Sequence, residues 1–186
     1  MVASQNEVEQ GAFERFVLPE VDVLLRVARG LTRHEADAED LVQDTLLRAF
    51  RAIDRFDGRH PRAWLFTILR NAHLNHHRRR RPGLLRDGNS AGRADRVASD
   101  DGPDARVDAS FEADVEFALK NLTPPFRQVV SLVDIGGLSY AEAARVLDVA
   151  EGTVMSRLHR ARRNLRQQLA DRSAHAHDGL EPEVGT

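Results

Sequence analysis

Apolar residues recur at intervals of three and four positions along most of this chain, and the alternation typical of strands is nearly absent. This spacing gives a helix one apolar face that can pack against a core. The segments that show it are 13–31, 38–53, 62–75, 111–121, 126–134, 141–147 and 154–169. The pattern therefore predicts an all-α protein.

The predicted helices fall into two groups, separated by the tract 82–109. This tract is rich in Gly, Asp, Ser, Ala and Arg, contains no aromatic residue and shows no hydrophobic period. Such a composition is typical of a flexible linker. We therefore expect two small helical domains, at 12–81 and 110–171, with disordered ends at 1–11 and 172–186.

Short polar motifs predict where several helices begin. Ser139 and Glu142 have the spacing of a capping box, in which each side chain bonds the backbone N–H of the other residue. Thr32 and Glu35 have the same spacing ahead of the segment 38–53. Pro19 is expected near a bend or a helix start within 13–31.

The C-terminal helices have the layout of a helix-turn-helix. A short helix after Ser139 is followed by a break at 148–152 and then by the apolar stripe of the last helix. The opposite face of that last helix is basic, and no acidic residue interrupts it between 152 and 169. A helix fits the DNA major groove, and Arg suits both phosphates and guanine edges. The layout predicts a DNA reader, with an ordinary helical hairpin that exposes a basic face as the alternative.

Composition excludes several kinds of protein. The chain has 186 residues and no cysteine, so it cannot form a disulfide framework, a thiolate nucleophile or a Cys-ligated zinc site by itself. No apolar run approaches the roughly 20 residues that span a bilayer. Residues 1–10 do not resemble a signal peptide, and we therefore expect a cytoplasmic protein.

The net charge of −2 conceals a strong segregation of charge. The segment 35–44 carries five acidic residues and no base, whereas 70–81 carries five arginines and no acid. Local basic patches, rather than net charge, determine affinity for DNA. The segregation suggests one nucleic-acid partner and one protein partner.

The densest histidine group offers an alternative function as a metal site. His73 and His77 have the (i, i+4) spacing of helical metal ligands. No acidic residue lies between them and four arginines follow, so a second cation is disfavoured. We therefore expect no metal or cofactor, and contacts with phosphate or with a protein instead. Nothing in the sequence predicts a catalytic residue, and we expect that the protein is not an enzyme.

Three motifs together resemble the extracytoplasmic-function (ECF, group 4) sigma factors of bacterial RNA polymerase. They are Ala38-Glu-Asp-Leu-Val-Gln-Asp-Thr45, which resembles region 2.2, Ala63-Trp-Leu-Phe-Thr-Ile-Leu-Arg-Asn71, which resembles regions 2.3 to 2.4, and Leu138-Ser-Tyr-Ala-Glu-Ala-Ala144 with Gly152-Thr-Val-Met-Ser-Arg-Leu-His-Arg160, which resemble region 4.2. Their order on either side of a linker is specific, although each motif alone is not. The last tract is also similar to the actinobacterial branch that answers thiol-oxidative and heat stress.

The resemblance implies a region 2 domain at 12–81 and a region 4 domain at 110–171. It implies partners as well: core RNA polymerase, through its β′ coiled coil and β flap, promoter DNA, and an anti-sigma factor that in the similar branch is often a zinc-binding redox sensor. The linker would thread through the polymerase cleft, or would serve only as a solubilising tether.

The family's region 2.2 helix docks on the β′ coiled coil, which here implicates Asp40, Leu41, Gln43 and Asp44. An acidic, partly apolar face suits a basic helical partner. The alternative is a solvated face with internal pairs, such as Asp44 with Arg48.

The family reads the −10 element with a loop and the helix after it, where a base is flipped out of a melted strand. The corresponding residues here are Phe56, Arg59, His60, Arg62, Asn71, Arg78 and Arg79. Trp64 could stack on a base, but a lone Trp in an apolar stripe is more often a core residue.

The family reads the −35 element with the last helix, which here implicates Gly152, Thr153, Met155, Ser156, Arg157, His159, Arg160 and Arg163. Many members carry Arg at the positions of Met155 and Val133, so their sequence preference cannot be transferred. A stand-alone helix-turn-helix regulator is the competing function, but it leaves the motifs at 38–45 and 63–71 unexplained.

Overall fold

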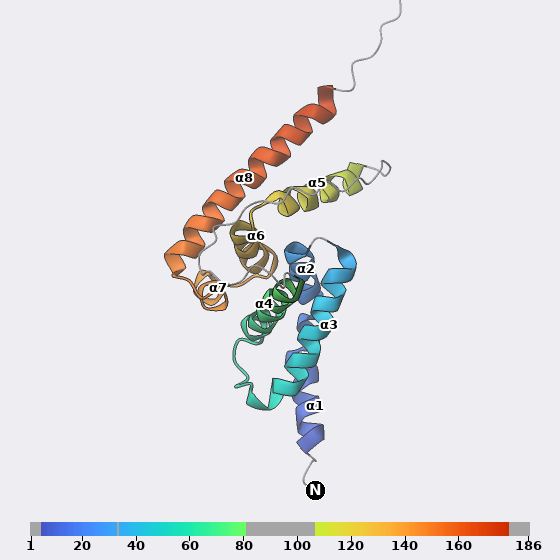
Figure 1. Cartoon of the computed structure of the whole chain (residues 1–186), viewed down its shortest axis with the longest axis vertical. Coiled ribbons are helices and arrows are strands. Elements are labelled where there is room, and N and C mark those ends of the chain that lie inside the picture. Colours follow the sequence, from blue (N-terminus) through green and yellow to red (C-terminus); the bar gives the residue numbers. More distant parts are fainter. Residues whose placement is uncertain (1–4, 33, 81–106, 179–186) are drawn as a thin grey trace, which may run out of the picture.

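The computed structural model describes residues 5–32, 34–80 and 107–178, and the described residues form helices and no strand (Figure 1). The prediction of an all-α fold is confirmed. The N-terminal bundle consists of α1 (Gln5–Phe16), η1 (Leu18–Glu20), α2 (Val21–Leu31), α3 (Glu35–Ala52), η2 (Ile53–Arg55) and α4 (Pro61–Arg80). The C-terminal bundle consists of α5 (Val107–Asn121), α6 (Pro124–Val130), η3 (Ser131–Ile135), α7 (Tyr140–Leu147) and α8 (Glu151–Asp178).

Pro19 divides the first helical segment, as predicted. It lies at the start of the short 3-10 turn η1, which separates α1 from α2. Downstream of this break, Leu24, Val27 and Ala28 are fully buried on one face of α2. The proline therefore lets α2 change direction and pack against α3.

The stripe predicted for α3 forms the centre of the N-terminal bundle. Ala38, Leu41, Thr45 and Ala49 are all buried. The Thr45 hydroxyl donates a hydrogen bond of 2.7 Å to the Leu41 carbonyl, which satisfies the one polar group on this face. Among the described residues, no helix is long and apolar enough to cross a membrane.

The core face of α4 differs from the prediction. The pattern favoured Ala63, Trp64, Ile68 and Ala72, and of these only Ala72 is fully buried, with the other three partly buried against the core. The most buried side chains are Leu65, Phe66 and Leu69. The reason is that α4 packs against α3 on one side and against α7 on the other, so it lacks a single apolar stripe.

Three segment ends are helical where disorder or linker was expected. Helix α1 begins at Gln5, α5 begins at Val107, and α8 continues to Asp178. The extension of α8 is anchored near its end, since Arg172 Nε donates to Asp114 Oδ1 at 2.6 Å and the guanidinium lies 4.4 Å from the centre of the Phe117 ring. The tail prediction is therefore wrong for 172–178, while 179–186 and most of the expected linker lie outside the described residues.

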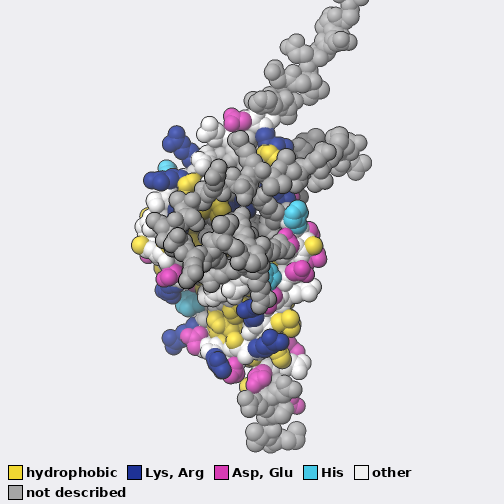
Figure 2. Space-filling model, in the orientation of Figure 1, with side chains coloured by type: hydrophobic (Ala, Val, Ile, Leu, Met, Phe, Trp, Pro, Cys, Tyr) yellow, Lys and Arg dark blue, Asp and Glu magenta, His cyan; other side chains and the backbone are white. Residues whose placement is uncertain are grey.

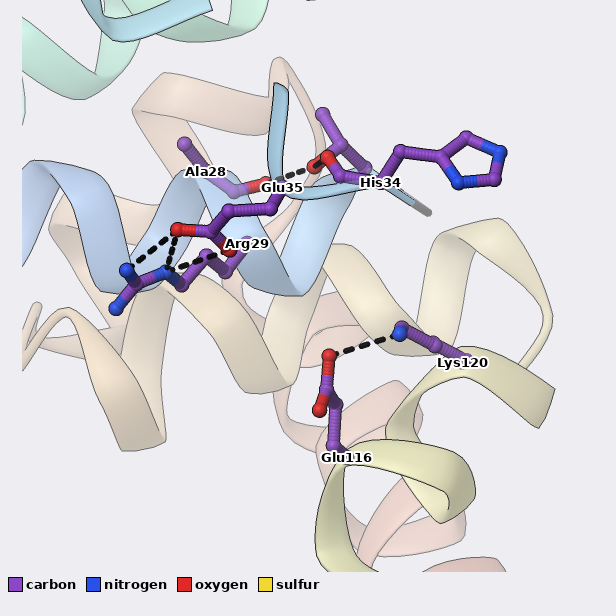
Figure 3. Close-up of polar contacts among 7 residues, drawn as sticks. Ala28, Arg29, His34, Glu35, Glu116 and Lys120 are labelled. Carbon is purple, nitrogen blue, oxygen red and sulfur yellow. Dashed lines mark hydrogen bonds and ion pairs between the residues drawn. The ribbon is translucent and has the colours of Figure 1, made fainter. Parts of the chain in front are cut away.

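The predicted capping box at Thr32 and Glu35 does not form. Glu35 instead accepts hydrogen bonds of 2.7 and 2.9 Å from Arg29 Nε, as Figure 3 shows, and the N-cap position is taken by His34 without a side-chain bond. The Thr32 hydroxyl donates to the Ala28 carbonyl at 3.0 Å. The hydrogen bond from Arg29 lowers the pKa of Glu35 and raises that of the guanidinium. The guanidinium of Arg29 is a strong neighbouring donor, and it binds the carboxylate that the capping box would have needed.

Candidate nucleic-acid interface

The helix-turn-helix begins with the capping box that the sequence predicted. Ser139 N–H donates to Glu142 Oε2 at 3.0 Å, the Ser139 hydroxyl donates to the same oxygen at 2.7 Å, and Glu142 N–H donates to the hydroxyl at 3.3 Å. These bonds from Ser139, with a smaller contribution from His60, lower the pKa of Glu142. Asp148 closes the other end of α7 with a left-handed backbone (φ 56°) that turns the chain toward α8.

Helix α8 is oriented by its apolar stripe. Val154, Leu158 and Ala161 are at most 1% exposed, and Leu165 is partly buried next to them. Arg162 adds an ion pair to η3, with Nε 3.1 Å from Asp134 Oδ2, and this contact raises the pKa of the guanidinium. The stripe and the ion pair fix which face of α8 points to solvent.

The solvent face of α8 carries most of the residues predicted to read DNA. Thr153 and Arg157 are half-buried at its margins, and the Ser156 hydroxyl donates to the Thr153 carbonyl at 3.1 Å. Figure 2 shows basic side chains along the edge of the molecule where α8 lies. The exposed members of the predicted set are Gly152, Met155, Ser156, His159, Arg160 and Arg163.

The loop before α4 is held by an aromatic cluster. The Phe56 ring stacks on Trp64 with centroids 4.5 Å apart, and it meets the Phe16 ring edge-on at 5.5 Å. Both Phe56 and Trp64 are partly buried and pack against the core, which agrees with the core role favoured for Trp64 although the side chain is not fully buried. The loop needs two left-handed residues, Gly58 (φ 78°) and His60 (φ 49°), to turn back toward α4.

Two of the predicted loop residues contact the C-terminal bundle. His60 Nδ1 lies 2.9 Å from Glu142 Oε1. Arg62 Nε donates to Glu20 Oε2 at 2.6 Å, and its Nη1 donates to the Gly136 carbonyl at 3.3 Å. These contacts join residues that are 82 and 74 positions apart in the sequence.

The other residues of the predicted −10 group are distributed along α4 and its loop. Arg59 and Asn71 are exposed. Arg78 and Arg79 lie in the last turns of α4, but their side chains lie outside the described residues. Arg70, which sequence reasoning did not select for this surface, donates from Nη2 to the Leu147 carbonyl at 3.2 Å.

The acidic face of α3 is only partly available to a partner. Asp40 and Gln43 are exposed, but Leu41 is 1% exposed and belongs to the core, so it cannot contact another protein directly. Asp44 accepts from Arg48 Nε at 2.8 Å and lies 3.4 Å from His76 Nε2. The bond from Arg48 is the main cause of the lowered pKa of Asp44.

The same face of α3 contains two exposed apolar residues: Leu47, which sequence reasoning did not select, and Phe50, which the spacing placed in the apolar stripe of this helix. Leu47 is 57% exposed and Phe50 is 43% exposed, with the Phe50 ring edge-on to Phe13 at 5.4 Å. Their spacing from Gln43 is the only sequence sign of this apolar end.

Within the described side chains, no group of three His, Asp or Glu residues could hold a metal ion, and the side chain of His77 lies outside them.

Two family models match the two bundles. Sigma-70 region 2 matches residues 16–82, and Sigma-70 region 4 matches residues 113–165. The chain is similar to the ECF RNA polymerase sigma factor SigE of Mycolicibacterium smegmatis, with 36% identity over 174 residues that cover 92% of this chain and 67% of the relative. It is also similar to EcfG of Rhodopseudomonas palustris, with 38% identity over 150 residues and 80% of each protein covered.

Solved structures resemble the chain over most of its length. The sigma factor RpoE in complex with the anti-sigma factor NepR, from Bartonella quintana, has a TM-score of 0.68 and 34% identity, and the match covers 85% of this chain and 96% of RpoE. CnrH in complex with the cytosolic domain of CnrY has a TM-score of 0.62 and 29% identity, with coverage of 91% and 99%. Both likenesses extend across the N-terminal and the C-terminal bundle.

Proposed function

Because the chain belongs to the ECF sigma factors of RNA polymerase, we propose that its two bundles read the two elements of a promoter. A sigma factor is a transcription initiation factor rather than an enzyme, and it lends promoter recognition to core polymerase. The observation that supports the assignment of surfaces is the exposed basic face of α8, which the buried stripe of that helix directs outward. The C-terminal bundle is the proposed −35 reader.

Within α8, residues near the amino end are proposed to contact bases. Met155, Ser156, His159 and Arg160 are exposed together over the first turns, where a recognition helix meets base edges. Arg163 lies further along the helix and is proposed to contact phosphate, as is Arg157 at the margin. Met155 offers an apolar surface that suits a thymine methyl group.

The loop before α4 and the exposed amide of Asn71 are proposed to read the −10 element. Flipping a base costs a few kcal/mol, which stacking and edge hydrogen bonds offset. Phe56 and Trp64 support this role from within, because their stack holds the loop against the core. The exposed Arg59 supplies positive charge beside it, and His60 and Arg62 offer further hydrogen-bonding groups.

The exposed face of α3 is the proposed docking site for the β′ coiled coil. Asp40 and Gln43 give it polar character, and Leu47 and Phe50 extend it with apolar surface. A mixture of acidic and apolar groups suits a basic amphipathic helix. Leu41 contributes only by supporting α3 from the core.

We further propose control by an anti-sigma factor, since RpoE and CnrH, which this chain resembles, were solved with NepR and CnrY. The tract 152–160 supports membership of the actinobacterial thiol- and heat-stress branch. The chain has no cysteine, so any thiol sensing would lie in a partner, such as a zinc-binding anti-sigma factor in the cytoplasm. A thiol oxidant should then leave transcription by the purified holoenzyme unchanged, while it relieves inhibition when that partner is present.

Run-off transcription tests the proposed function. Purified bacterial core polymerase is given a library of promoter fragments, with and without this chain. Initiation from a defined subset of fragments is expected and would reveal both promoter elements. If core polymerase gains nothing while the chain alone still binds a duplex site, the protein is better explained as a stand-alone regulator.

A further inference from the structure

Arg162 differs from its neighbours on α8 because a carboxylate already binds it. Its Nε donates to Asp134 Oδ2 at 3.1 Å, and its Nη2 donates to Asp134 Oδ1. The two planar groups therefore meet in a bidentate pair, which fixes their relative orientation as well as their distance. Arg160 and Arg163 are exposed on the face proposed to read the −35 element. The basic run of α8 thus contains one arginine that is bonded within the chain beside others that face solvent.

Arg162 lies at the margin between the buried stripe of α8 and its exposed face. It follows Leu158 by four residues, which is about one helical turn, and it adjoins Ala161. Ala161 is fully buried but has only a methyl side chain, and Leu165, one turn later, is partly buried. A helix seated by one stripe is restrained least against rotation about its axis, because its buried contacts lie along one line. The pair at the margin restrains that rotation.

The partner of Arg162 lies immediately ahead of the first helix of the helix-turn-helix. Asp134 belongs to η3, a turn of π-helix, a rare geometry that is frequent at functional sites. The hydrogen bonds to Asp134 are the main cause of the raised pKa of Arg162, and Tyr140, the first residue of α7, contributes to it. Helices α7 and α8 pack side by side (Figure 1). Arg162 therefore ties the second helix of the motif to the start of the first.

The contribution of this pair is geometric rather than energetic. The side chains of Arg162 and Asp134 are 45% and 30% exposed, and ion pairs exposed to this extent add little to stability. A reading helix, however, must be held to within a fraction of an ångström for its side chains to meet their targets. Rotation of α8 would carry Ser156 and His159 across the groove and away from base edges.

We propose that Asp134 is a specificity-determining positioning residue of the −35 reader. It binds Arg162, sets the rotation of α8 against α7, and so aligns the exposed side chains with the bases. Arg162 acts through this pair and does not bind phosphate. The DNA ligand rests on the proposed function, whereas the orientation of α8 is a property of the protein alone.

Asp134→Asn is the first test, because it keeps the size of the side chain and removes its charge. The unaltered chain first selects a preferred duplex from a random pool. The ratio of affinities for the preferred and a random duplex is expected to fall about tenfold in Asp134→Asn, as it does for one mismatched base pair. If Asp134 only withheld Arg162 from DNA, the released guanidinium would tighten binding to both duplexes and keep the ratio. That result overturns the proposal.

Two variants of Arg162 separate positioning from contact with phosphate. Arg162→Lys keeps the positive charge, but an ammonium group cannot form the bidentate fork, so the ratio should fall here as well. Arg162→Ala should leave the slope of log affinity against log salt concentration unchanged. A phosphate contact would instead lower that slope by about one in Arg162→Ala and would largely survive in Arg162→Lys.

The matched control is a second Asp–Arg pair on the same helix. Arg172 Nε donates to Asp114 Oδ1 at 2.6 Å, and the two side chains are 42% and 25% exposed. Asp114→Asn therefore releases an equivalent arginine at the far end of α8 and should leave the affinity ratio unchanged. Melting temperatures should stay close to that of the unaltered chain in both Asn variants. An equal loss of selectivity in both would show that charge alone, and not positioning, is responsible.

The orientation of α8 is measured directly, without DNA. The chain lacks cysteine, so spin labels can be attached at Arg145→Cys on α7 and Asn164→Cys on α8, both exposed positions. The distribution of label distances, from double electron–electron resonance, is expected to shift or broaden in Asp134→Asn and to stay unchanged in Asp114→Asn. An unchanged distribution in Asp134→Asn overturns the proposal. If the distribution changes but the unaltered chain selects no preferred duplex, the proposed function fails and the positioning of α8 stands.

Discussion

The two surfaces proposed to read DNA differ in how many faces of their helices are buried. Helix α8 packs through one stripe, which leaves its opposite face exposed at the edge of the molecule. Helix α4 is buried on two sides, against α3 and against α7, and its Arg62 and Arg70 bond to the C-terminal bundle. The comparison shows that a helix packed through one face leaves its basic residues exposed, whereas packing through a second face engages some of them within the chain.

The arginines of the two surfaces illustrate the same difference. Arg62 and Arg70 bond to backbone carbonyls at helix ends, whereas Arg160 and Arg163 are exposed to solvent. The same guanidinium group therefore joins the two bundles at Arg62 and Arg70, whereas at Arg160 and Arg163 it remains exposed on the face proposed to read DNA.

Truncating a buried side chain beneath the exposed face of α8 should have the largest effect on stability. Leu158 is 1% exposed beneath α8, and Leu158→Ala is expected to lower the free energy of unfolding by about 3 kcal/mol, from lost burial and the remaining cavity. Urea unfolding measures this loss. The control is Met155→Ala, which alters a side chain that is 52% exposed on the other face and should cost no more than about 0.5 kcal/mol. Equal losses in the two variants would show that α8 is not seated by this stripe.

Arg160→Ala tests whether the exposed face reads sequence. It is expected to cost roughly 1–3 kcal/mol in binding to the −35 duplex and to relax base preference, with no change in melting temperature. Titration of promoter fragments from the run-off library measures both effects. Arg26→Ala, an exposed arginine on α2, is the control for charge alone. Unchanged selectivity in Arg160→Ala would remove this residue from the reading surface.

The same difference explains which helices could be predicted from the sequence. The stripes of α3 and α8 were predicted because each helix has one buried face. In α4, Leu65, Phe66 and Leu69 were missed because two partners bury two faces, and the second partner is distant in the sequence. No local pattern identifies that partner.

Capping motifs show a second limit of sequence reasoning. The spacing of Ser139 and Glu142 forms a capping box, but the same spacing at Thr32 and Glu35 does not, because Arg29 is close enough to bind the carboxylate. The sequence also did not reveal the partners of His60 and Arg62, because Glu142 and Gly136 lie 82 and 74 positions away. The sequence spacing identified side chains that form hydrogen bonds. The partner of each side chain was determined by the tertiary structure.

The aromatic pair of the loop before α4 should have an intermediate effect, and it tests what holds that loop in place. If Phe56 and Trp64 stabilise the loop before any DNA binds, a double-mutant cycle with Phe56→Ala and Trp64→Ala should give a coupling of about 1 kcal/mol in urea unfolding. The matched cycle pairs Phe56 with Phe117, which lies in the other bundle, and should show no coupling. A coupling near zero for the stacked pair would indicate that its contact does not stabilise the free protein.

The smallest predicted effect concerns Glu142, whose carboxylate caps α7 and also contacts His60 of the loop before α4. Glutamine suits the same cap position, so Glu142→Gln should lose only the contribution of the negative charge at the start of the helix, about 0.5 kcal/mol near pH 7. Because folding lowers the pKa of Glu142, this contribution is present above the ordinary pKa of a glutamate and is lost as pH falls through the lowered value.

The difference in unfolding free energy between the original chain and Glu142→Gln should therefore vanish in acid, once the pH has fallen below the lowered pKa of Glu142. The control is Glu116→Gln, which alters an exposed (i, i+4) pair with Lys120 and should change the free energy of unfolding little at any pH. A stability difference that persists unchanged in acid would mean that the shape of the Glu142 side chain, rather than its charge, stabilises the start of α7.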